Sequence, residues 1–230
     1  MCLAAFLFSS GTLVLTEAGS KRRASLALVR GAAALAAHDP GGLEPLEADL
    51  PGFQAALSGS RHTLKRALTD PKIFSGIGNA YSDEILYRAR LSPFLLCARL
   101  DPDQVGRLYY ATQACLREWT ERLWCQAGGA FPEKVTAFRD GMAVHGRYRR
   151  PCPACGTLVQ RIVYAENEAN YCPRCQTGGR VLRDRALSRL LKDDWSHRIE
   201  DHPAPLASGD SGAARSAPTG RRRRVRSNGT

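Results

Sequence analysis

The sequence predicts an α+β protein, and three observations support that fold class. Short apolar and β-branched runs near the N-terminus alternate with glycine-containing turns, as in a small antiparallel sheet. Residues 61–146 carry the apolar spacing of helices. Two Cys-x2-Cys pairs flank a β-branched run near residue 160. The chain of 230 residues is 43% hydrophobic, which suffices for one large or two small domains and excludes a wholly disordered protein.

The N-terminal part, residues 1–30, is predicted to form a short antiparallel β segment. Its apolar runs are only five or six residues long and are separated by turn residues. The expected strands are 3–8, 12–16 and 24–29. The next residues, 31–60, are rich in Ala, Gly and Pro and are interpreted as a connector.

The clearest element of the helical domain, residues 61–146, is a helix that begins after Asp101. Asp101 is the expected N-cap, Pro102 lies in the first turn and Gln104 is the third helical residue, which together form a capping box. We interpret Trp119 and Trp124 as core residues. The apolar face is expected to contain Val105, Leu108, Thr112, Cys115, Trp119 and Leu123.

A glycine turn, Gly-Ile-Gly-Asn at residues 76–79, separates two predicted helices. The first ends near Asp70, and the second runs from Asn79, the expected N-cap, to about Arg90. A helix N-terminus with adjacent glycines can bind phosphate through its backbone amides. Two interpretations stay open from this segment alone: a phosphate site, or a plain cap and turn with Lys65 as a solvated charge.

Four of the eight cysteines lie in residues 147–192, in the pattern C-x2-C-x16-C-x2-C. Two such pairs can supply the four thiolates of a tetrahedral structural zinc site. The alternative is two disulfides or four buried thiols, and disulfides require an oxidising compartment. The sequence therefore predicts a zinc-finger β-hairpin with strands at 159–163 and 169–171 and one structural Zn²⁺. The ligands are Cys152, Cys155, Cys172 and Cys175.

The positive charge is concentrated in this cysteine-containing segment. The whole chain has a net charge of +11, whereas residues 1–146 carry 16 basic and 14 acidic side chains. Residues 147–192 carry ten basic and three acidic side chains. This excess indicates a polyanionic partner. Residues 193–230, rich in Pro, Gly, Ser and Arg, are predicted to form a disordered basic tail. No apolar run approaches the roughly 18 residues of a membrane span, so no membrane partner is expected.

Three separate pieces of the chain resemble the formamidopyrimidine-DNA glycosylase and endonuclease VIII family. Residues 65–93, with the glycine turn, are similar to its helix–two-turn–helix motif. Residues 144–176 are similar to its zinc finger, and residues 16–26 to the end of its N-terminal β-sandwich. In this comparison residues 1–30 are a truncated remnant of that sandwich. The resemblance covers about residues 3–192.

The resemblance implies a role in base-excision DNA repair. Members extrude a damaged base from duplex DNA and act as bifunctional DNA glycosylases and AP (apurinic/apyrimidinic) lyases. By this likeness the Gly78 amide and Asn79 hold a phosphate beside the lesion, Lys65 lies near the lesion pocket, and Arg147 contacts the DNA backbone. The expected partner is double-stranded DNA with damaged bases or abasic sites. The expected protein is a monomer in the cytoplasm, of bacterial type and associated with the nucleoid.

The finger hairpin departs from the family pattern at one position. The family arginine, five residues before the third cysteine, falls on Asn167, next to Glu166 and Glu168. The hairpin tip then either contacts DNA differently or uses Arg161 as a substitute. Both alternatives stay open from the sequence.

The N-terminus departs more strongly. Family members begin with Pro-Glu, whose proline amine is the nucleophile, and this chain begins Met1-Cys2-Leu3. No catalytic residue is therefore assigned. The alternative to a glycosylase is a catalytically inactive, zinc-containing DNA-binding module, and a third hypothesis is a zinc ribbon that binds RNA or protein. The sequence does not indicate whether an oxidised purine or an oxidised pyrimidine would be the preferred lesion.

Overall fold

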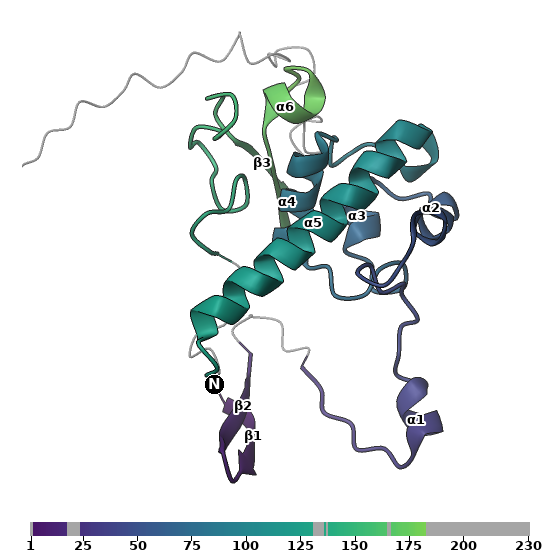
Figure 1. Cartoon of the computed structure of the whole chain (residues 1–230), viewed down its shortest axis with the longest axis vertical. Helices are drawn as coiled ribbons and strands as arrows, with labels where there is room; N and C mark the ends of the chain where they lie inside the picture. The colour runs from purple at the N-terminus through teal and green to yellow at the C-terminus, as the bar shows by residue number, and fades with distance from the viewer. Residues whose placement is uncertain (1, 18–23, 131–135, 137, 165–166, 183–230) are drawn as a thin grey trace, which may run out of the picture.

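The structure, a computed structural model, describes residues 2–17, 24–130, 136, 138–164 and 167–182. Helices pack against one side of the long helix α5 (Pro102–Ala127), and each of the two sheets within these residues is a two-stranded antiparallel hairpin (Figure 1). The α+β fold class is confirmed. The predicted disordered tail, residues 193–230, lies outside the described residues.

The N-terminal hairpin pairs β1 (Cys2–Phe8) with β2 (Gly11–Thr16), and Ala5 lies opposite Val14. It extends below the helical unit in Figure 1. The strand expected at 24–29 is wrong, because these residues form no strand. A run of β-branched and apolar residues becomes a strand only where a neighbouring strand pairs with it. Neither strand of the described hairpin pairs with residues 24–29.

The region interpreted as a connector contains two helices, α1 (Ala32–Ala36) and α2 (Leu50–Ser58). Asp49 caps α2, because its carboxylate accepts a 2.9 Å hydrogen bond from the Gly52 amide. Phe53 and Leu57 of α2 are buried in the main core, and the Phe53 ring lies 4.7 Å from that of Phe74. The helical unit therefore begins earlier than residue 61.

The centre of this unit is the pair α4 (Asn79–Ala89) and α5 (Pro102–Ala127), which pack against each other (Figure 1). The capping box of α5 is confirmed, since Asp101 accepts from the Gln104 amide and Gln104 accepts from the Asp101 amide. The short helices α3 (Leu64–Leu68) and η1 (Cys97–Arg99) complete the core. Its central members include Leu64, Leu68, Phe74, Ile85, Leu86, Leu108, Cys115 and Trp119.

The cysteine-containing unit consists of β3 (Gln160–Tyr164), β4 (Asn167–Tyr171) and α6 (Pro173–Thr177). Both β4 and α6 pack against α4. The Gln176 side-chain amide donates a 2.9 Å hydrogen bond to the Leu91 carbonyl just beyond α4. One helix therefore supports both the glycine turn and the finger. Within the described residues, no helix has the length and hydrophobicity that crossing a membrane requires.

Candidate nucleic-acid interface and metal centre

The glycine turn before α4 has no side chain at residues 76 and 78 to cover its backbone. Gly76 has φ +72°, a left-handed conformation that favours glycine. Gly78 is the N-cap of α4 in an extended conformation, and a Cβ built there would meet no atom within 4 Å. Asn79 is thus the first helical residue and not the N-cap that the sequence suggested. The difference arises because the Gly78 carbonyl accepts the first helical bond, from Ser82.

The N-terminus of α4 carries backbone amides that donate to no group of the described residues. Within the described residues, the N–H groups of Asn79, Ala80 and Tyr81 have no acceptor. The half-exposed Asn79 side chain likewise makes no hydrogen bond there. Free amides together with the positive end of the helix dipole attract an anion. The turn therefore has the chemistry of a phosphate site.

Lys65 lies directly behind this turn and is only 2% exposed. Its ammonium donates to the Asn79 carbonyl at 2.7 Å, to Ser82 Oγ at 2.8 Å and to Asp83 Oδ1 at 2.5 Å. Burial lowers the pKa of Lys65, and the neighbouring Asp83 carboxylate opposes that shift. All three N–H groups are used inside the protein, so none remains for a DNA phosphate. Lys65 instead fixes the first turn of α4.

The second carboxylate oxygen of Asp83 connects this network to two other segments. Oδ2 lies 2.8 Å from Nδ1 of His145 and accepts from the backbone and side-chain amides of Asn170, at 3.1 and 3.2 Å. Asn170 belongs to β4 of the finger. Asp83 is 1% exposed, and a buried carboxylate needs this number of donors to offset its lost hydration. The turn and the finger therefore share one buried charge network.

The next residue, Glu84, anchors the chain segment that leads into the finger. Its carboxylate accepts from the backbone amides of Ala143, Val144 and His145, at 2.8, 2.9 and 2.9 Å. Hydrogen bonds to a charged acceptor are roughly twice as strong as neutral ones. These contacts hold the segment before Arg147 against α4.

The four predicted zinc ligands come together. All four sulfur atoms lie within 4.8 Å of one another, and the Cys155 Sγ to Cys172 Sγ and Cys152 Sγ to Cys175 Sγ distances are 3.4 and 3.9 Å. Tetrahedral coordination with Zn–S bonds of about 2.3 Å places sulfurs about 3.8 Å apart. The cluster fits one structural Zn²⁺. The Tyr87 hydroxyl, on α4, lies 3.3 Å from Cys152 Sγ and so joins the metal centre to the helix.

The two predicted DNA-contacting arginines both lie on the finger side. Arg147 donates from Nη2 to the Pro151 carbonyl at 3.1 Å, and its buried Nε has no partner within the described residues. The side chain of Arg161 is 42% exposed, lies over the Tyr148 ring at 4.6 Å and reaches Glu168 at 3.4 Å. Stacking on Tyr148 restrains Arg161 while its guanidinium stays accessible.

Sequence reasoning missed the residues that hold these parts together, namely Asp83, Glu84, Tyr87, His145 and Asn170. Their contacts with the finger side of the chain span 59 to 87 positions, and Asp83 also pairs with Lys65, 18 positions earlier. Charged residues on a predicted helix give no periodic signal of such contacts. Only the fold brings them together.

Comparisons with known proteins agree with this architecture. Residues 42–123 match the family described as the formamidopyrimidine-DNA glycosylase H2TH domain, and residues 150–178 match the zinc finger found in FPG and IleRS. A formamidopyrimidine-DNA glycosylase-like protein of Mycobacterium tuberculosis, itself uncharacterized, is 40% identical over 153 residues. These residues are 66% of this chain and 93% of that protein. The chain belongs to the formamidopyrimidine-DNA glycosylase family.

Longer members of the formamidopyrimidine-DNA glycosylase family match over part of their length. The formamidopyrimidine-DNA glycosylase of Thermus thermophilus is 38% identical over 148 residues, which are 60% of this chain and 54% of that enzyme. The crystal structure of MutM (Fpg) from the same species has a TM-score of 0.50 at 39% identity, over 59% of this chain and 53% of that one. Lactococcus lactis Fpg, in complex with DNA that contains an abasic site, shares the fold. Its TM-score is 0.53 at 22% identity, over 62% of this chain and 54% of that one. The chain thus spans about half the length of these longer relatives.

Proposed function

We propose that this chain binds damaged duplex DNA in base-excision repair. One observation carries the proposal: within the described residues the amides at the N-terminus of α4 have no acceptor, and a Cβ built at Gly78 would meet no atom within 4 Å. A DNA phosphate has the charge and the acceptor oxygens to satisfy these donors. The similarity to the formamidopyrimidine-DNA glycosylase of Thermus thermophilus supports the same proposal.

In this proposal the glycine turn and the finger contact the DNA backbone at separate points. The Gly78 amide and the Asn79 side chain hold one phosphate, and Arg147 and Arg161 contact others. Lys65 acts from behind by fixing the Asn79 carbonyl. Contacts to phosphate position a protein on DNA without reading its sequence. That suits a protein that must find lesions in any sequence.

DNA N-glycosylase and AP lyase activity is the finer proposal, and it rests on the relatives named as glycosylases. The alternative is a DNA-binding module without catalysis. The buried Lys65 amine donates all its hydrogens inside the protein, so it is a structural group in either case.

DNA binding is tested by fluorescence anisotropy with two duplexes of the same sequence, one undamaged and one with a tetrahydrofuran abasic analogue. We expect tighter binding to the lesion duplex and an affinity that falls steeply with salt, by a log–log slope of about 0.9 per phosphate neutralised. Equal, salt-independent binding of the two duplexes would contradict the proposal.

Catalysis is tested separately by borohydride trapping with an oligonucleotide that contains a true abasic site. A lyase that acts through an amine forms a Schiff base, which borohydride reduces to a stable covalent adduct. An adduct supports the glycosylase and lyase proposal. Specific lesion binding without an adduct supports the module.

A further inference from the structure

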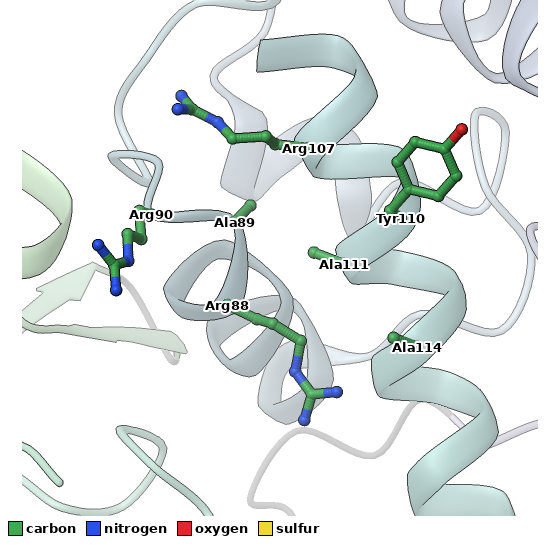
Figure 2. A pocket seen from close by; sticks show the side chains of 7 residues that line it. All are labelled: Arg88, Ala89, Arg90, Arg107, Tyr110, Ala111 and Ala114. Atoms are coloured by element: carbon green, nitrogen blue, oxygen red, sulfur yellow. The ribbon is translucent and has the colours of Figure 1, made fainter. Parts of the chain in front are cut away.

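A shallow groove lies between the C-terminal end of α4 and α5, at the end of α4 opposite to the glycine turn. Its volume is about 420 Å³. Figure 2 shows Ala111 and Ala114 pointing from α5 toward α4, with Ala89 opposite them. Alanine side chains end at Cβ, so the floor between the helices stays low and apolar. A ligand can therefore place an apolar group there.

The edges of this groove are cationic and aromatic. Arg88, Arg90 and Arg107 lie around the alanines, and Tyr110, 65% exposed, completes the lining (Figure 2). Arg88 pairs with Glu118 at 2.6 Å.

The positive charge of the groove arginines is only partly neutralised by acidic side chains. Glu118 is shared, because it also pairs with Arg122 at 3.2 Å. Within the described residues, Arg90 and Arg107 have no ion pair, although Asp103 lies one helical turn before Arg107. The groove thus presents uncompensated positive charge beside an apolar floor.

We propose that this groove binds an acidic peptide segment of a partner protein, with one apolar side chain of the peptide on the alanine floor. Charge complementarity selects the occupant. A second copy of this chain has the same net charge of +11 and is repelled. Duplex DNA offers mainly phosphates and sugars at its surface and has no flexible apolar side chain for the alanine floor.

The test measures the anisotropy of a short labelled peptide of aspartates around one phenylalanine, titrated with the full chain. Two control peptides replace the phenylalanine with glycine or the aspartates with lysines. We expect the acidic, phenylalanine-containing peptide to bind best. Equal binding of the glycine peptide would overturn the proposal, because it would leave only unspecific charge attraction.

Variants locate the binding surface. A double variant with Arg90→Glu and Arg107→Glu, two exposed residues, should weaken peptide binding about tenfold or more, since two contacts become repulsive. Ala114→Glu, which fills the floor and adds a negative charge, should do the same. Arg66→Glu makes the same charge change at an exposed site on α3 and should leave peptide binding close to wild type.

Either of two outcomes would overturn the assignment. Peptide affinity unchanged in both groove variants would place the peptide elsewhere. A loss of undamaged-duplex binding in the groove variants, without peptide binding to the wild type, would make the groove a DNA surface. Lesion-DNA binding is measured on the same variants. Its failure in the wild type would contradict the proposed function and leave the groove proposal standing.

Discussion

The ammonium of Lys65 and the carboxylate of Asp83 form a 2.5 Å ion pair in which the two side chains are 2% and 0% exposed. A buried pair of this kind has lost the hydration of both ions, so removal of one partner leaves an uncompensated charge, at a cost of about 3–5 kcal/mol. Because the pair fixes the start of α4 and contacts the finger, it connects folding stability to the proposed DNA interface.

This coupling can be measured by urea unfolding. We expect Asp83→Asn and Lys65→Met each to lower the free energy of unfolding. The double variant should lose less than the sum of the two by about 1–3 kcal/mol, because neither charge is then left alone. Additive losses would contradict the ion pair.

Lys65→Met should also weaken binding to a lesion duplex while leaving the salt slope unchanged. The reason is that Lys65 positions the Asn79 carbonyl and donates no hydrogen bond to DNA. A lysine that directly neutralised a phosphate would lower the slope by about 0.9 on removal. Anisotropy titrations at several salt concentrations distinguish the two roles.

Asn79→Ala is expected to weaken lesion-duplex binding about tenfold, the loss of one charge-assisted hydrogen bond, with little change in thermal stability. Its side chain makes no hydrogen bond within the described residues, so the fold does not depend on it. Gln126→Ala removes an exposed amide near the end of α5 and serves as the matched control. Unchanged affinity in Asn79→Ala would exclude a phosphate contact there.

Arg161→Gln should reduce the salt slope by about 0.9, as expected for one lost phosphate contact. Arg117→Gln is the control, since the Arg117 guanidinium already donates to Gln113 and to the Leu46 carbonyl. Identical salt slopes for wild type and Arg161→Gln would contradict the hypothesis that Arg161 takes the role of the family arginine, whose position is occupied by Asn167.

Zinc removal should change which thiols react with Ellman's reagent. With zinc bound, the exposed Cys2 and Cys125 should react quickly. Burial raises the pKa of Cys115 to about 12, and Cys97 is also buried, so these two should react slowly. A chelator strong enough to remove zinc should release one ion per chain and add four reactive thiols. Four extra thiols without released metal would contradict the zinc site.

The parts of the fold that depend on local signals were predictable. The capping box at Asp101 and the cysteine spacing each specify a structure within a few residues, and both predictions are confirmed. Helix α2 was missed because Pro51 and Gly52 resemble a connector. Proline is tolerated in the first helical turn, where its missing N–H has no acceptor in any case.

Other errors came from tertiary packing. Trp124 was expected in the core and is 77% exposed, whereas Trp119 is 3% exposed. Helix α5 has 26 residues, whereas its partner helix α4 has only 11. The last turns of α5 therefore extend beyond the residues of α4 that pack against it. The Lys65 network was also not predictable from the sequence. A lysine in a short helix gives no sign that it will be buried and paired with an aspartate 18 positions later.

Helix α4 carries the glycine turn at its start, contacts the metal centre through Tyr87 and joins strand β4 through Asp83. Because one helix carries both proposed contact surfaces, their separation is set by α4. A duplex that touches both has to match that separation, so the energy of bending is a property of the DNA. DNA sites with weakened base stacking bend at a lower cost in free energy. A protein that requires a bent duplex would therefore bind such sites preferentially, before it contacts any base.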